Sequence, residues 1–155
     1  VSAGSSIYVC GTKKDGSRFR VALRDPRGDE NSAIGVLTLS DTTISTSGDY
    51  ERYFEKDGVR YHHILDPRTG YPADSGLMQV TIICDDSVIG DALSTACFVL
   101  GLDEGMKLAA KYGVNAIFVD TDKNIWYNTP DVLNYFEFTG KDSGYVLNEY
   151  NQARS

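Results

Sequence analysis

The sequence lacks long hydrophobic runs and clusters of basic residues, and each absence argues against a class of protein. No run approaches the roughly 18 apolar residues that a membrane-spanning helix needs, and residues 1–6 show neither the basic start nor the apolar run of a signal peptide. The 15 Lys and Arg residues are not bunched, and the net charge is −7. This balance argues against nucleic acid as a partner, because phosphate binding needs clustered cations. An anionic ligand would need help from a metal or from backbone amides.

The chain is also poor in cysteine. Cys10, Cys84 and Cys97 are odd in number, far apart in the sequence and each surrounded by apolar residues. We therefore expect buried free thiols rather than disulfide partners or metal ligands. What the chain does contain is 155 residues with 41% hydrophobic and 24% charged content, which is typical of one globular domain with a sizeable core.

Short apolar runs separated by turn signals dominate the first half of the chain. They predict strands over residues 7–10, 19–23, 34–39 and 42–46, arranged as a β-meander. Residues 78–84 are rich in Val and Ile and indicate a central strand.

The second half adds the helices. Residues 89–100 are apolar on most sides and predict a buried helix, and residues 103–112 begin with acids and end with a base before a glycine, as helices do. Two strands are expected at 115–120 and 124–127, and a weakly ordered tail at 141–155. The predicted fold class is α+β, with a mainly antiparallel sheet and two packed helices. Late aromatic residues are interpreted as packing: Trp126, Tyr127, Tyr135, Phe136 and Phe138.

The segment 62–72 (HHILDPRTGYP) gathers groups suited to chemistry. A hairpin over 53–54 and 59–62 delivers two histidines into a turn that contains Asp66 and Arg68 and is stiffened by two prolines and a glycine. Histidine suits acid or base work, because its ordinary pKa lies near neutrality. The alternative is that both histidines are ordinary strand-end residues and that the rest is a plain turn.

A second candidate lies on the first predicted helix. Asp91 and Thr95 are one turn apart, so their oxygens lie on one side, with Ser94 beside them. A carboxylate with hydroxyls suits Mg²⁺, which takes one or two carboxylates together with substrate phosphates and water. The alternative is structural, because Asp is favourable near a helix start and helical Ser or Thr bonds back to the preceding turn.

The turn Ser47-Gly48-Asp49 is a third candidate, because its backbone amides could face a phosphate or a carbonyl group. Small polar residues also describe many plain turns. The pair Asp85-Asp86 is assigned no role. Five aromatic residues nearby in the sequence either stack on a flat ligand or belong to the core: Tyr50, Tyr53, Phe54, Tyr61 and Tyr71.

Three motifs occur in an order and spacing typical of one family: residues 46–51 (TSGDYE), 62–72 and 91–96 (DALSTA). Together they resemble the carboxy-terminal half of the FAD:protein FMN transferases, the ApbE-like flavin transferases, from about residue 1 to residue 130. The resemblance implies an ApbE-like, T-fold-like architecture. It also implies a Mg²⁺-dependent enzyme that cleaves FAD at its pyrophosphate, releases AMP and attaches FMN to a threonine or serine hydroxyl of a target protein.

The resemblance further implies roles for single residues. His63 matches the position that activates the acceptor hydroxyl, and Ile64 matches a contact to the flavin nucleotide. Asp91, with Ser94 and Thr95, matches the metal-binding helix. Attack on a pyrophosphate needs a base near the hydroxyl and a cation on the phosphate oxygens, and the metal would balance the charge of the substrate. The turn at residues 47–49 is then expected to support the nucleotide.

Family members typically carry a comparably long segment upstream, and this chain begins after it. We therefore expect residues 1–140 to be the carboxy-terminal part of a catalytic domain that lacks the amino-terminal half of its own fold, and the isolated chain to be weakly active or inactive. Two alternatives stay open: an FAD-binding module, and an FAD pyrophosphatase without a protein acceptor. The resemblance also suggests an exported protein, anchored on the outer face of a bacterial inner membrane.

Overall fold

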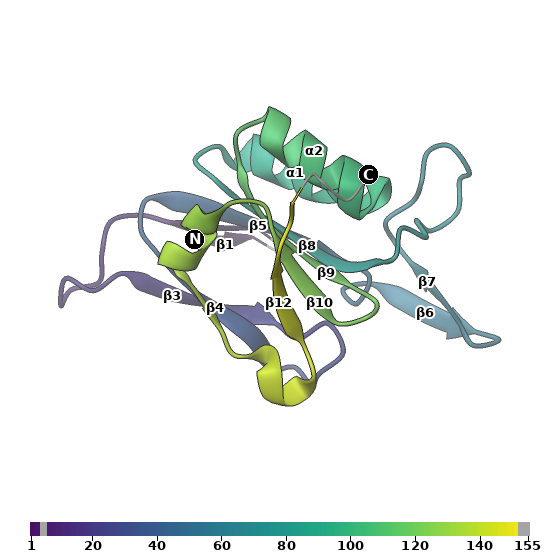
Figure 1. Cartoon of the computed structure of the whole chain (residues 1–155), viewed down its shortest axis with the longest axis horizontal. Coiled ribbons are helices and arrows are strands. Elements are labelled where there is room, and N and C mark those ends of the chain that lie inside the picture. The colour runs from purple at the N-terminus through teal and green to yellow at the C-terminus, as the bar shows by residue number, and fades with distance from the viewer. Residues whose placement is uncertain (4–5, 152–155) are drawn as a thin grey trace.

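A seven-stranded sheet forms the middle layer of the molecule, with two helices on one face and a smaller sheet against the other (Figure 1). The computed structural model describes residues 1–3 and 6–151. In spatial order the large sheet contains β1 (Ser2–Ala3), β2 (Ser6–Val9), β5 (Thr42–Gly48), β8 (Leu77–Cys84), β9 (Asn115–Asp120), β10 (Asn124–Tyr127) and β12 (Val146–Glu149). The smaller sheet contains β11 (Phe136–Phe138), β4 (Ala33–Leu39) and β3 (Phe19–Arg24), and the hairpin consists of β6 (Tyr53–Lys56) and β7 (Val59–His62).

This architecture confirms the predicted α+β class with mainly antiparallel pairing, since the parallel contact between β10 and β12 is the one exception among the described strand pairs. The hairpin lies beside the main body and extends away from the large sheet (Figure 1).

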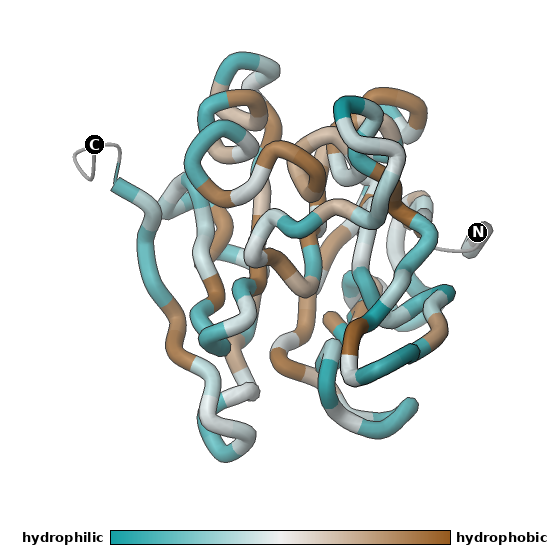
Figure 2. The backbone as a smooth tube through the Cα atoms, turned by 90° about the vertical axis from the view of Figure 1, so that its right-hand side faces the viewer, coloured by the Kyte–Doolittle hydropathy of each residue, from teal (hydrophilic) through white to brown (hydrophobic). Residues whose placement is uncertain are grey.

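The central strands β8 and β9 carry buried apolar side chains on both of their faces. Side chains alternate along a strand, so Ile82 and Phe118 pack against the helices, whereas their neighbours Ile83 and Ile117 pack against the smaller sheet. Figure 2 shows the hydrophobic stretches running through the interior. The late aromatic residues pack into these two clusters as predicted: Trp126, Tyr127, Tyr135, Phe136 and Phe138.

Helix α1 (Ser87–Leu100) packs on β5 and β8, and α2 (Leu102–Lys111) packs on α1. The helix α1 begins two residues before the predicted start, because the carboxylate of Asp86 accepts hydrogen bonds from the backbone N–H groups of Val88 and Ile89 at 2.8 and 3.1 Å. Asp86, which had been given no role, is therefore an N-cap. No helix in the described part of the chain is long and apolar enough to cross a membrane.

The predicted β-meander is wrong. Strand β2 pairs with β5 in the large sheet, while β3 and β4 pair with each other in the smaller one. Turn signals fix where a strand ends but not which strand it joins. Strands β3 and β4 form a separate sheet, which buries Leu23 and Leu37 in the core between the two sheets.

The tail expected at 141–155 is not weakly ordered over its first part. A 3₁₀ helix, η2 (Gly140–Ser143), leads into β12, which pairs in parallel with β10. Tyr145 is 3% exposed and belongs to the core between the sheets. A second short 3₁₀ helix, η1 (Pro130–Asn134), precedes β11. Residues 152–155 lie outside the described residues.

The three cysteines are free thiols, as predicted, but their burial differs. Cys97 is fully buried between the helices, and its burial raises the pKa of its thiol to about 12. Cys84 is partly buried, and Cys10 is exposed just after β2. The expectation of burial is thus wrong for Cys10, because the apolar run that contains it ends with Val9 in the core.

Candidate functional site

A groove of about 430 Å³ brings together three segments that are far apart in the sequence. The end of β5, the loop after β7 and the second turn of α1 each contribute one wall. These are the three motifs selected from the sequence. The lining residues are Thr46, Ser47, Gly48, Glu51, Arg52, His63, Ile64, Leu65, Asp91 and Thr95.

Contacts within the turn that follows the histidines hold its shape. The carboxylate of Asp66 accepts hydrogen bonds from the guanidinium of Arg68 at 2.7 to 3.1 Å and from its backbone N–H at 2.9 Å. The Arg68 guanidinium lowers the pKa of the Asp66 carboxyl. Gly70 has a φ of 73°, which glycine adopts without strain. Neither Asp66 nor Arg68 lines the groove, so this acid and cation shape the loop.

The two neighbouring histidines face different surroundings, because adjacent residues of an extended chain point in opposite directions. His62 is 8% exposed, its Nε2 lies 3.1 Å from the carbonyl oxygen of Ala73, and its ring meets that of Phe98 edge to face at 5.5 Å. His63 is exposed and lines the groove. The ordinary structural interpretation therefore holds for His62, and the chemical one stays a prediction for His63.

The contacts of His63 favour one tautomer. Its Nδ1 lies 3.3 Å from the carbonyl oxygen of Arg52, and its backbone N–H donates to the same oxygen at 3.1 Å. In a neutral imidazole, Nδ1–H is then the donor and Nε2 keeps its lone pair. Sequence reasoning did not single out Arg52, although it also lines the groove. A main-chain contact of this kind leaves no signal in the sequence.

Burial lowers the pKa of His62, so folding should depend on pH through this residue. Below about pH 6.5 the unfolded chain binds a proton that the folded chain resists, so stability is lost as the pH falls. Protonation also gives Nδ1 a hydrogen that has no acceptor among the described residues. We expect the urea concentration at the midpoint of unfolding to decrease as the pH is lowered from about 6.5 to about 5.

His62→Gln should flatten this pH dependence, because glutamine does not titrate, whereas His63→Gln should leave it intact. Urea unfolding of the three proteins across the same pH range measures the effect. Equal slopes for the wild type and His62→Gln would show that His62 does not carry it.

The metal candidates divide between the groove and the interior. Asp91 and Thr95 are exposed and line the groove, whereas Ser94 is 1% exposed and lies behind it. The Ser94 hydroxyl donates to the Asp91 carbonyl oxygen at 3.0 Å and lies 2.8 Å from the hydroxyl of Ser47. The Ser47 hydroxyl is also 3.1 Å from that of Thr95. Asp91 and Thr95 therefore face the groove and the buried Ser94 does not, and the metal-binding role of the three residues stays a prediction.

The donors in the groove fit Mg²⁺. Within residues 1–3 and 6–151, no three His, Cys, Asp or Glu side chains gather as a metal site. One carboxylate and one hydroxyl, from Asp91 and Thr95, are hard oxygen ligands that leave positions for water and phosphate oxygens, as Mg²⁺ prefers. The Asp91 carboxylate also accepts a hydrogen bond from the Ser6 hydroxyl at 3.1 Å.

The turn at residues 47–49 has only part of its predicted place. Ser47, Gly48 and the buried Ile64 line the groove, and a side chain on Gly48 would collide with the ring of Tyr50. Asp49 does not line it. Its carboxylate lies on the other side of the turn, at a cavity of about 390 Å³, and is paired with Arg27. The predicted nucleotide contact of Asp49 therefore gains no support.

None of the five nearby aromatic residues lines the groove. The rings of Phe54 and Tyr61 stack on each other at 5.1 Å across the hairpin, and the guanidinium of Arg60 lies over the ring of Tyr53. The hydroxyl of Tyr50 donates to the side chain of Gln79 at 2.8 Å. Stacking on a ligand in this groove is therefore not their role.

Comparison with known proteins identifies relatives of the chain. A model of the ApbE family matches residues 1–118. The chain is 40% identical to the FAD:protein FMN transferase of Klebsiella pneumoniae (strain 342) over 148 residues, 95% of the chain. It is 41% identical to the enzyme of the same name from Treponema pallidum (strain Nichols) over 134 residues, 81% of the chain.

Solved structures agree. The crystal structure of the ApbE protein from Thermotoga maritima matches 77% of the chain with a TM-score of 0.69 and 44% identity. The flavin transferase ApbE from Vibrio cholerae matches 86% of the chain with a TM-score of 0.72 and 29% identity. The chain spans 44% and 37% of the length of the two curated relatives, and 38% and 42% of these two solved chains.

Proposed function

The chain belongs to the ApbE family, and on this premise we propose that it forms part of the active site of a flavin transferase. The reaction moves FMN from FAD to a threonine or serine hydroxyl of an acceptor protein and releases AMP. The observation that supports it best is the convergence of three distant motifs on one groove, with His63 on one wall and Asp91 and Thr95 on another. A base and a cation site in one groove are the two groups that the reaction needs.

In the proposed step, Nε2 of His63 accepts the proton of the acceptor hydroxyl, because Nδ1–H is committed to the carbonyl of Arg52. The hydroxyl oxygen forms a bond to the phosphorus of the FMN portion, the bond from this phosphorus to the bridging oxygen breaks, and AMP leaves with that oxygen. His63 holds the transferred proton until it is lost to water. The two walls of the groove fix the hydroxyl and the phosphorus relative to each other.

The wall formed by α1 would bind the metal that balances the charge of the substrate. The carboxylate of Asp91 and the hydroxyl of Thr95 would hold Mg²⁺, which screens the pyrophosphate and stabilises the leaving phosphate when it is bound. Ser47 keeps Thr95 in place through the contact between their hydroxyls. The chain has a net charge of −7 and its basic residues are not clustered. A cation held by Asp91 and Thr95 would therefore supply positive charge beside the anionic substrate.

The test is covalent labelling. The chain is incubated with FAD, Mg²⁺ and a threonine-containing flavoprotein target, and flavin fluorescence is read after denaturing electrophoresis. A hybrid that adds the unmatched portion of the Klebsiella relative is tested in parallel, since the chain spans 44% of that protein. We expect strong labelling by the hybrid and weak labelling, or none, by the chain alone.

Other outcomes identify the alternatives. FAD binding without labelling by either protein would favour a binding module. Formation of FMN and AMP without labelled acceptor would favour a pyrophosphatase. The outer face of a bacterial inner membrane is proposed as the location from the resemblance, and fractionation of cells that express the full gene would test it.

A further inference from the structure

Asp49 follows two residues that line the groove, but its carboxylate is bound by Arg27, which lies outside the groove. Its two carboxylate oxygens accept hydrogen bonds from the guanidinium of Arg27 at 2.7 and 2.6 Å. Asp49 is 7% exposed, so this paired geometry lies largely out of water. A bidentate pair of this kind fixes orientation as well as distance. The carboxylate is therefore an anchor for the turn that carries it.

The anchor continues into the loop between β3 and β4. The carboxylate of Asp25, 6% exposed, accepts a hydrogen bond from the backbone N–H of Arg27 at 2.8 Å. The same oxygen accepts the hydroxyl hydrogen of Tyr145 at 2.6 Å. Tyr145 lies between η2 and β12, beyond the residues that the family model matches. A chain of contacts thus runs from the carboxy-terminal segment to Asp49, through the buried Tyr145 and Asp25 and the partly exposed Arg27.

On its other side, Asp49 connects to both walls of the groove. It directly follows Ser47 and Gly48 in the chain, and its own N–H donates to the carbonyl oxygen of Met78 at 3.1 Å. One guanidinium nitrogen of Arg60, on the strand that leads to the histidines, lies 3.7 Å from the Asp49 carboxylate. The hydroxyl wall and the histidine wall therefore meet at one side chain.

We propose that Tyr145, Asp25, Arg27 and Asp49 form a positioning network, which sets the distance between the Ser47 wall and the His63 wall of the groove. None of the four residues lines the groove. Removing Arg27 takes away the two short hydrogen bonds and leaves the Asp49 carboxylate only the longer contact with Arg60 at 3.7 Å, so we expect Asp49 to shift and to move the turn with it. Displacement of about 1 Å in a reacting group lowers turnover by up to about 100-fold.

The proposal has a test that does not depend on turnover, because the chain contains two histidines and so gives two imidazole Hε1 signals by proton NMR. Assignment uses His62→Gln and His63→Gln. We expect Arg27→Met and Tyr145→Phe to shift the His63 signal in the folded chain. Arg27→Lys keeps the charge but not the paired geometry, and should give a smaller shift.

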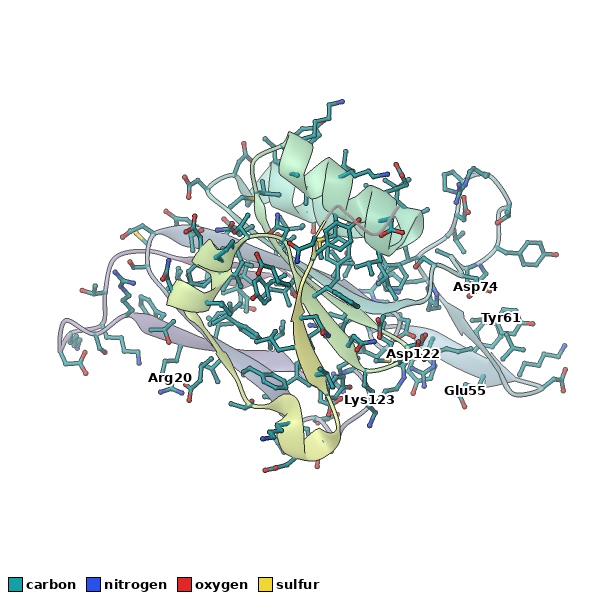
Figure 3. All side chains as sticks on the ribbon, viewed as in Figure 1. Arg20, Glu55, Tyr61, Asp74, Asp122 and Lys123 are labelled. Atoms are coloured by element: carbon teal, nitrogen blue, oxygen red, sulfur yellow. The ribbon has the colours of Figure 1, made fainter. Side chains whose placement is uncertain are left out.

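Matched controls remove similar groups elsewhere. Arg20 pairs with Glu137 on the exposed face of the smaller sheet, and Figure 3 places it far from Glu55 and Tyr61, which mark the hairpin. Tyr150 donates its hydroxyl to the exposed Asp103. Arg20→Met and Tyr150→Phe should leave the His63 signal unchanged. Urea unfolding confirms that each variant is folded under the conditions of the measurement.

The second measurement rests on the proposed function and uses the labelling hybrid. Arg27→Met should lower kcat about 10- to 100-fold while the KM for FAD changes less than about threefold, since the network touches no substrate. Folded Arg27→Met and Tyr145→Phe variants with the wild-type His63 signal would overturn the network. A shifted signal in a hybrid that does not label would instead count against the proposed function alone.

Discussion

Replacing His63 with alanine is expected to abolish transfer of FMN while leaving FAD bound. His63 is exposed in the groove, and its Nε2 is the nitrogen that its contact with the Arg52 carbonyl leaves free. A positioned base contributes about 10²- to 10⁴-fold to a rate, so labelling by the hybrid should fall by that factor. The dissociation constant of FAD, measured by quenching of flavin fluorescence, should change less than about threefold, because the side chain acts on the acceptor hydroxyl.

His63→Asn distinguishes the role of His63 as a base from its role in holding the loop through the Arg52 carbonyl. The asparagine amide can donate to the Arg52 carbonyl in place of Nδ1–H, but it has no basic nitrogen. It should therefore be as inactive as His63→Ala. If His63→Asn keeps most of the activity, the residue orients the loop and does not accept the proton. If His63→Ala instead loses FAD binding, the role of His63 is structural.

Much of the candidate site could be predicted from the sequence, because its parts are local. The loop at 62–72 owes its shape to its own prolines, glycine and Asp66-Arg68 contact, and helical spacing alone places Asp91 and Thr95 on one side of α1. Convergence of these segments on one groove followed from the resemblance. Periodicity gave the strands and helices to within a few residues, since their buried faces are continuous.

What the sequence could not predict depends on distant partners. The sequence suggests that Asp49 belongs to a phosphate-binding turn, but its partner Arg27 lies 22 residues earlier, in the loop between β3 and β4. The sequence does not distinguish His62 from His63. Their side chains point to opposite sides of the strand, and only the fold shows which side is buried. Strand β12 is short, with two apolar and two polar residues, and it forms because β10 offers a free edge and because Tyr145 enters the core.

Replacing Asp91 with asparagine should remove the response of the enzyme to Mg²⁺. Asp91 supplies the carboxylate that lies one helical turn from Thr95 in the groove, and the amide of asparagine is a far weaker ligand for a hard cation. Loss of metal stabilisation worth several kcal/mol corresponds to a fall of about 100-fold or more in transfer. The measurement is the rate of labelling by the hybrid across a Mg²⁺ titration.

Glu104→Gln is the matched control, because it removes one negative charge from the exposed face of α2, where Glu104 pairs with Lys107. It should leave the Mg²⁺ titration unchanged and so exclude an effect of net charge. Asp91 is exposed and its carboxylate accepts a hydrogen bond from the Ser6 hydroxyl at the exposed surface, so its replacement should alter stability by less than about 0.5 kcal/mol. A loss of transfer in the stable Asp91→Asn variant therefore reports on the metal. An unchanged half-saturating Mg²⁺ concentration in that variant would contradict the assignment of Asp91 as a metal ligand, and the groove would then supply the base His63 without the metal site.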